Sequence, residues 1–182
     1  LTGIVGGRPK PSPVIKLFSF LIDKSSLNIE VDINGERHKV EIPSGAELNI
    51  NTLAAGEVAV LQGDEIEVPL VQVAHARSGD KGNYSNIGVI ARKAEFLPWI
   101  RASLTEEAVA SYMKHVFEGA PEGQTNQVQR YEIPGLNALN FLLLDALGGG
   151  GVASLRIDPQ GKAFAQQLLD MPVKVPASLL NS

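Results

Sequence analysis

The densest cluster of polar residues lies at positions 75–86, between two apolar segments, and reads HARSGDKGNYSN. Within it, Arg77 offers a planar fork that fits a carboxylate or a phosphate, and Lys81 offers a point charge. Gly79 and Gly82 allow the backbone to approach a ligand and to expose N–H groups in an anion-binding nest. This pattern predicts a binding site for a small anionic molecule.

The same cluster holds candidates for acid–base chemistry. Asp80 or His75 would exchange the proton, Lys81 is the third catalytic candidate, and Ser78 and Asn83 would contact the ligand. The alternative is a solvated turn, because Gly, Asp, Asn and Ser are the residues that turns use. We favour the binding site, since binding residues often lie on loops that a rigid scaffold holds in place.

A second interpretation of the cluster is nucleophilic catalysis. Ser78 and Lys81 match the S-x-x-K pattern, in which one helical turn brings a serine nucleophile beside a lysine base. Gly79 and Gly82 argue against a helix here, and matches to a four-residue pattern often arise by chance. An acylating serine is therefore the weaker hypothesis.

Two further motifs lie nearer the C-terminus. Residues 148–153 match the dinucleotide pattern G-x-G-x-x-A, but they are expected between a helix and a strand, which is the wrong context for that site. We expect a loop there, with a glycine flap over a ligand as the weaker alternative. Arg156 would be a second anion contact if its strand end lies beside the polar cluster. Asp158 is expected to cap a helix and Lys162 to be solvated.

Composition excludes several classes of function. The chain has 182 residues and a net charge of −4, which disfavours a nucleic-acid partner. There is no cysteine, so disulfides, thiol nucleophiles and thiolate metal sites are excluded. The histidines are not spaced for zinc, and we predict no metal and no cofactor. No apolar run approaches the ~20 residues of a membrane helix, so we expect no membrane contact and a cytoplasmic location.

The N-terminal third is expected to be rich in β-structure. Residues 27–33 and 36–42 alternate around Asn34 and Gly35, which suit a type I′ turn, and the register places Asp32 opposite Arg37. His38 is expected at a half-buried rim. A second hairpin is predicted from 57–61 and 66–74. The opening residues resemble the middle of a connection, so we expect a piece of a longer chain.

We place a domain boundary near Val68 and Pro69, which separates a β-rich segment, 1–67, from a second domain, 68–182. In the second domain, strands are predicted at 69–76, 85–92, 127–133 and 152–157, and helices at 105–117, 136–147 and 158–169. This order predicts an α+β fold of the ferredoxin-like kind, in which a mixed or antiparallel sheet carries helices on one face.

Several separated motifs resemble the C-terminal domain of the acyclic terpene utilisation AtuA family, over about residues 68–177. They are HARSGDKGNYSNIGVIAR, then RYEIPGLNALNFLLLDALGGGGVASLRIDPQGK, and a closing VKVP. The resemblance implies a ferredoxin-like fold, a role in bacterial catabolism of terpenoid or other branched acids, and a larger N-terminal domain of which residues 1–67 are the tail. It does not imply an established reaction.

The sequence is compatible with two functions. In the first, the chain is a subunit or fragment of a catabolic protein, and Arg77 and Lys81 hold a carboxylate or an acyl-CoA ligand. In the second, it is a non-catalytic assembly module that forms a homo-oligomer or pairs with the missing N-terminal domain.

Overall fold

The computed structural model describes residues 11, 13, 15, 18, 20–46, 64–117 and 127–180. Contacts divide the chain into two compact units, one formed by Phe18–Ala55 and the other by Leu1–Leu17 with Gly56–Ser182. Each unit is described by itself. The predicted boundary at Val68 falls inside a strand of the larger unit, and the assignment of 1–67 to another domain stays a prediction.

The smaller unit contains the predicted hairpin. Strands β1 (Glu30–Ile33) and β2 (Glu36–Lys39) pair antiparallel with Asp32 opposite Arg37, so the predicted register is confirmed. Asn34 and Gly35 have φ angles of 55° and 92°, as a type I′ turn requires. Both strands are exposed along their length, and the expected half-burial of His38 is wrong. A short 3-10 helix, η1 (Lys24–Ser26), precedes them.

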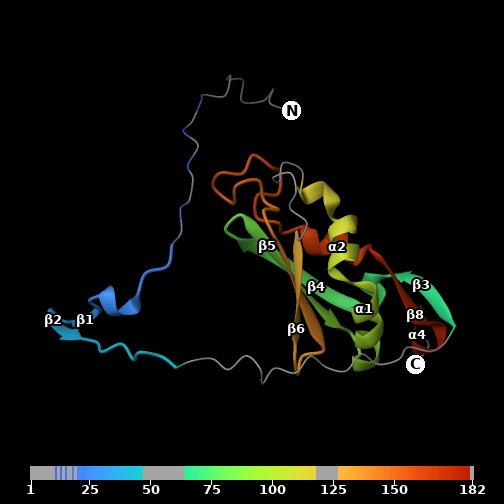
Figure 1. Ribbon diagram of the computed structural model, residues 1–182, viewed down its shortest axis with the longest axis horizontal. Helices are drawn as coiled ribbons and strands as arrows, with labels where there is room; N and C mark the ends of the chain where they lie inside the picture. Colours follow the sequence, from blue (N-terminus) through green and yellow to red (C-terminus); the bar gives the residue numbers. More distant parts are fainter. Residues whose placement is uncertain are drawn as a thin grey trace. The chain divides into compact units, whose positions relative to one another are not determined.

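The larger unit is built on a four-stranded antiparallel sheet with the order β4–β5–β7–β6 (Figure 1). Its strands are β4 (Ala74–Lys81), β5 (Tyr84–Ala91), β6 (Val128–Ile133) and β7 (Ala138–Leu143). A two-stranded antiparallel sheet joins β3 (Glu65–Pro69) to β8 (Pro172–Pro176). The second strand of the hairpin predicted from 57–61 and 66–74 overlaps β3, while residues 57–61 lie outside the described part of the chain, so the pairing of this hairpin stays a prediction.

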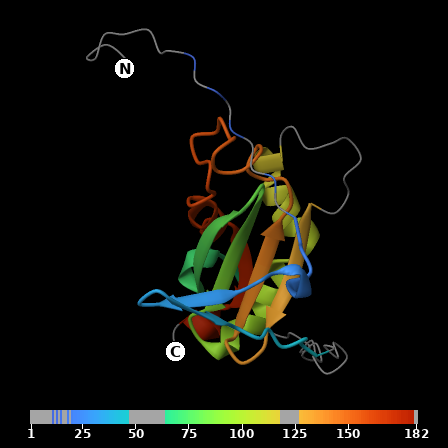
Figure 2. The same cartoon turned by 90° about the vertical axis from the view of Figure 1, so that its left-hand side faces the viewer.

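Helices cover one face of the four-stranded sheet, and in Figure 2 they lie behind it. Ile87, Val89, Leu139 and Phe141 point into this layer and are at most 2% exposed. These sheets and helices confirm the predicted α+β class. None of the helices in the described ranges is long and apolar enough to cross a membrane. The helices are α1 (Leu97–Ser103), α2 (Glu106–Tyr112), α3 (Phe164–Leu169), α4 (Ala177–Leu180), and the 3-10 helices η3 (Leu70–Gln72), η4 (Ala94–Phe96) and η5 (Lys114–Phe117).

The predicted helix at 136–147 is wrong, because this segment forms β7. Leu139, Phe141 and Leu143 alternate into the core, while Asn140 and Leu142 face the other side of the sheet. The run is apolar at nearly every position, so a helical stripe and a strand alternation fit it equally well. Gly135 and Asn137 have positive φ in the turn after β6. This turn connects β6 to β7, and the two strands pair as a hairpin.

Three other expectations differ from the structure. The predicted strand at 152–157 is irregular, with Leu155 and Ile157 fully exposed, because the glycines before it adopt positive φ angles that end regular structure. The helix predicted at 158–169 is shorter than expected, because α3 begins at Phe164. The predicted helix at 105–117 ends as α2 at Tyr112 and continues in 3-10 form, and η3 interrupts the strand predicted at 69–76.

Candidate anion-binding site

The polar cluster is a strand and not a loop. β4 runs to Lys81, and only Gly82 and Asn83 form the turn before β5. Gly82 has a φ of 66° at the first turn position, where type II′ turns use glycine. The predicted strands at 69–76 and 85–92 left residues 77–84 as a loop, and this expectation is wrong. The side chains from 75 to 81 instead alternate between the two faces of the sheet.

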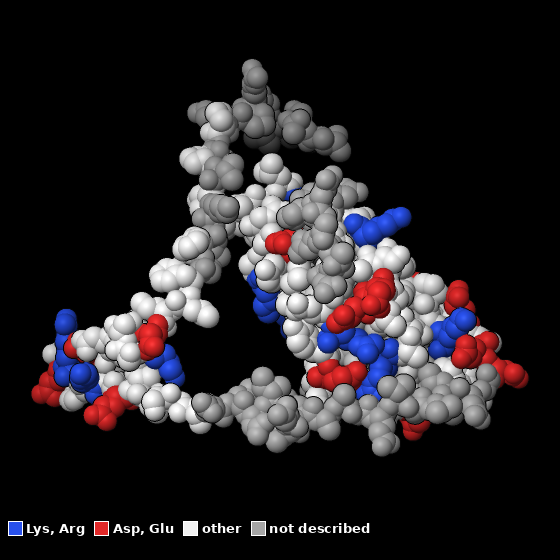
Figure 3. Space-filling view, in the orientation of Figure 1, with Lys and Arg blue, Asp and Glu red and all other residues white. Residues whose placement is uncertain are grey.

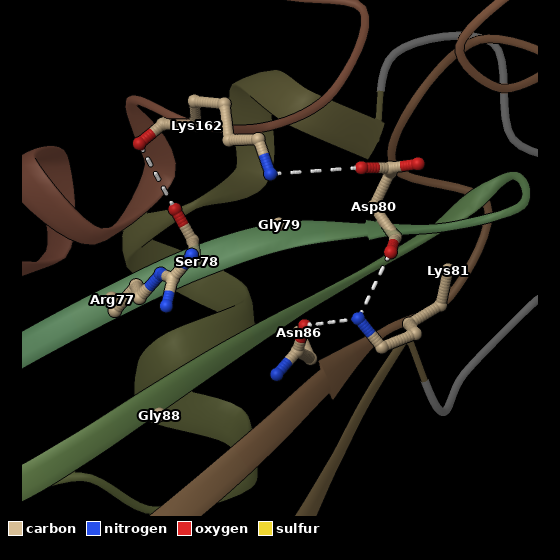
Figure 4. Close-up of a pocket in the computed structure, with 8 residues that line it drawn as sticks. All are labelled: Arg77, Ser78, Gly79, Asp80, Lys81, Asn86, Gly88 and Lys162. Atoms are coloured by element: carbon tan, nitrogen blue, oxygen red, sulfur yellow. Dashed lines mark hydrogen bonds and ion pairs between the residues drawn. The ribbon is translucent and has the colours of Figure 1, made fainter.

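A cavity of about 520 Å³ opens beside β4, which is an edge strand of the sheet (Figure 4). It brings together five of the predicted site residues, and it adds three that the sequence analysis did not place there. The predicted ones are Arg77, Ser78, Gly79, Asp80 and Lys81, and the added ones are Asn86, Gly88 and Lys162. His75, Gly82, Asn83 and Arg156 do not line it.

Strand pairing sets the directions of these side chains. Arg77 lies opposite Gly88, and Gly79 lies opposite Asn86, so both pairs share the face that the helices leave open. Ser78 and Asp80 point to the other side, toward the segment that precedes α3, as Figure 4 shows. The cavity therefore wraps around the edge of the sheet and meets side chains from both of its faces.

The cavity carries more positive than negative charge. Lys81 Nζ donates to the Asp80 carbonyl oxygen at 2.9 Å and to Asn86 Oδ1 at 3.0 Å. Lys162 Nζ lies 3.8 Å from Asp80 Oδ1. Arg77 is exposed and makes no hydrogen bond or ion pair with any residue that the structure describes. Three cations thus face one carboxylate, which favours an anionic ligand.

On another face of the molecule the charges are mixed. Figure 3 shows Lys and Arg interspersed with Asp and Glu on the face that carries α1 and α2. Within the described ranges, no three His, Asp or Glu side chains gather as a metal-binding group. The face that carries α1 and α2 therefore does not share the excess of cations found at the cavity.

Lys162 is the site residue that the sequence analysis missed. It was expected to be solvated, but its ammonium lies over the β4 edge, 3.0 Å from where a Cβ on Gly79 would stand. Asp158 holds the segment in place by accepting from the backbone N–H groups of Lys162, at 3.0 Å, and Ala163, at 2.8 Å. The predicted capping of a helix by Asp158 is wrong, because α3 begins at Phe164 with Ala163 as its N-cap, and Asp158 instead orders the turn that precedes α3. The signal was Gly79 itself, since a glycine inside a strand often marks a close approach.

Ser78 serves the fold through its hydroxyl group. The hydroxyl donates to the Gly161 carbonyl oxygen at 2.6 Å and accepts from the Ala165 backbone N–H, in the first turn of α3, at 2.9 Å. Ser78 is 6% exposed. Because Ser78 and Lys81 lie three residues apart on a strand, they point to opposite faces. The arrangement that an S-x-x-K nucleophile needs is absent here.

Asn83 ties the β4–β5 turn to the glycine-rich segment. Its Nδ2 donates to Asp145 Oδ1 at 2.8 Å, and its Oδ1 accepts from the Gly149 N–H at 2.6 Å. A Cβ on Gly150 would stand only 2.7 Å from the Gly82 carbonyl oxygen. The glycines at 148–150 therefore let the segment pack closely against the turn.

Arg156 and His75 lie away from the cavity. Arg156 Nη1 donates to the carbonyl oxygens of Val116, at 2.6 Å, and Ala146, so its guanidinium joins two segments of backbone. Arg92 Nη1 lies 3.1 Å from His75 Nε2. His75 and Lys81 are six residues apart on β4, which corresponds to about 20 Å along a strand. The two side chains therefore do not meet at one reacting bond.

The comparisons with known proteins agree with this description. A family model described as the AtuA ferredoxin-like domain matches residues 68–174, which is more than half of the chain. Searches of curated proteins and of solved structures found no significant match. The matched range contains every residue that lines the cavity. The motifs that suggested this family are thereby confirmed, and the chain belongs to the family of proteins with an AtuA ferredoxin-like domain.

Proposed function

We propose that the cavity beside β4 binds the carboxylate of a small organic acid, in a catabolic protein of the acyclic terpene utilisation type. The observation that carries the proposal is the guanidinium of Arg77, which has no partner among the described residues and faces a cavity shared with Lys81 and Lys162. A planar guanidinium fits a carboxylate with two parallel hydrogen bonds. The two ammonium groups add charge attraction.

Asp80 is the acid–base candidate at this cavity. Its carboxylate lines the cavity and is held near Lys162, while its carbonyl oxygen accepts from Lys81 Nζ. Lys81 lies on the open face of the sheet, within the same cavity as Arg77. A reaction at this place would therefore use Asp80 and Lys81. His75 would take part in a separate step of the reaction or in no step at all.

The test is a titration of the full chain with acetate and with acetyl-CoA, followed by NMR shifts of the backbone amides. Binding should move the amides of residues 77–88, and Arg77→Ala should weaken it at least tenfold, since a hydrogen bond to a charged group is worth about 1.5–3 kcal/mol. Arg37→Ala is the matched control, because Arg37 is an exposed arginine in the other unit. The two probes separate a site for the free carboxylate from a site for the thioester.

Two results would reject the proposal. One is the absence of any shift at residues 77–88 with acetate, whether or not acetyl-CoA binds, because acetyl-CoA carries no carboxylate. The other is equal affinity of the Arg77→Ala and Arg37→Ala variants for acetate. Comparison with the wild-type spectrum checks that each variant is folded.

The second candidate is an assembly module, and it is supported by the open face of the sheet. Ile90 and Tyr131 on this face are 42% and 49% exposed. If Arg77→Ala combined with Lys81→Ala changed the sedimentation coefficient of the chain without affecting acetate or acetyl-CoA, the assembly function would replace the proposed one.

A further inference from the structure

A second cavity lies on the open face of the same sheet. It has a volume of about 320 Å³, and its walls are almost entirely apolar. The residues that line it come from β4, β5 and β7, from the end of β6 and from the turn between β6 and β7. The apolar ones include Ile90, Ile133, Leu136 and Ala138, and the polar ones are His75 and Arg77 on β4. Ile90 and Leu136 are 42% and 59% exposed, so this apolar surface is open to a ligand.

The two cavities meet, because Arg77 and Gly88 line both of them. These residues are opposite one another in the β4–β5 register. A Cβ added to Gly88 would meet only the Arg77 carbonyl oxygen, at 3.9 Å, so the surface above Gly88 is open. The cationic cavity thus continues over Gly88 into the apolar one, without a side chain that separates them at this position.

We infer that the ligand is an amphiphilic monocarboxylate, an acid with one anionic head and a medium-length hydrocarbon tail. This inference rests on the proposed function, because Arg77 and Lys81 would hold the head. The tail would cross Gly88 and lie against Ile90 and Ala138, which are adjacent in the β5–β7 register. From Asn86 to Ile90 the strand advances four residues, about 13 Å, which suits an extended medium-chain acid.

The apolar cavity is open, so the tail would lose only part of its contact with water. A fully buried methylene strengthens binding about fourfold, and a half-buried one about twofold. Octanoate has several more methylenes than acetate. We therefore expect octanoate to bind the full chain at least tenfold more tightly than acetate does.

The experiment compares acetate with octanoate in titrations of the full chain, again read from amide shifts. Acetate should move residues around Arg77 and Lys81 only. Octanoate should also move Ile90 and Ala138. Ile90→Ser should weaken octanoate about threefold or more and leave acetate unchanged. Ile66→Ser is the matched control, because Ile66 is 41% exposed on β3 and lines neither cavity.

The outcomes separate this inference from the proposed function. If acetate and octanoate bind with equal affinity, or if Ile90→Ser and Ile66→Ser bind octanoate alike, the tail site is rejected while the carboxylate site stands. If octanoate moves the amides around Arg77 and Lys81 but not those of Ile90 and Ala138, the tail site is also rejected. If neither acid binds, the proposed carboxylate site fails and the inference fails with it.

Discussion

The substitution Ser78→Ala tests whether this residue is a structural bridge. The Ser78 hydroxyl joins β4 to the start of α3, because it donates to the Gly161 carbonyl oxygen and accepts from the Ala165 N–H. Alanine removes both hydrogen bonds at a position that is 6% exposed. Water reaches such groups poorly, so the carbonyl and the amide would lose partners that are hard to replace.

The loss of stability expected for Ser78→Ala follows from the Gly161 carbonyl and the Ala165 N–H, which both lose a hydrogen-bond partner. A buried polar group left without a partner costs about 1–3 kcal/mol, and removal of a side chain that caps a helix costs about 1 kcal/mol. We therefore expect the free energy of unfolding of the larger unit to fall by about 3 kcal/mol. With a urea dependence of about 2 kcal/mol per molar, the unfolding midpoint would fall by about 1.5 M.

Fluorescence of Trp99 provides the assay. It is the single tryptophan of the chain, it is 7% exposed, and it lies in the same unit as Ser78. Ser111→Ala is the control, since Ser111 is exposed on α2. A midpoint for Ser78→Ala that coincides with the control would refute the bridging role, and so would labelling of native Ser78 by a serine-directed acylating probe.

Two further perturbations test other parts of the fold. Gly161→Ala should destabilise the larger unit by about 2 kcal/mol or more in the same urea assay, because Gly161 has a φ of 61° and a Cβ there would stand 2.6 Å from Ser85 Oγ. Gly151→Ala, with nothing within 4 Å of the added Cβ, should change little, and equal effects would contradict the packing. Glu107 has a lowered pKa, through a hydrogen bond with its own backbone amide and then one with Thr105. The carboxylate of Glu107 therefore stabilises the fold above the usual pKa of a glutamate, and this stabilisation is lost as the pH falls through the lowered pKa. Glu107→Gln should make the urea midpoint less sensitive to acid. An unchanged acid dependence would contradict this assignment.

The parts of the fold predicted from sequence are those with unambiguous local patterns. The strict alternation around Asn34 and Gly35 was enough to set a hairpin register, and Thr105 marked the start of α2. β7 was missed because it carries apolar residues on both faces of the sheet. Its pattern of apolar residues therefore does not distinguish the two-residue repeat of a strand from the repeat of a helix. Its identity as a strand depends on pairing with β5 and β6, which no local pattern contains.

The candidate site was predicted only in part for a similar reason. The residue types at 77–81 pointed to an anion, and five of them line one cavity. Lys162 reaches that cavity from a segment eighty residues further along the chain, through contacts across the β4 edge. The roles of Asn83 and Arg156 likewise depend on tertiary contacts with the glycine-rich segment and with η5.

Both edges of the four-stranded sheet are partly covered by side chains from elsewhere in the unit. Lys162 lies against β4 at Gly79, and Glu106 of α2 accepts from the Arg130 N–H on β6 at 2.7 Å. An exposed strand edge is a template for addition of a strand from another molecule, and charged side chains at the edge oppose this. Extension of this sheet from copy to copy is therefore disfavoured, and the surface of the sheet that stays available to another molecule is its open face.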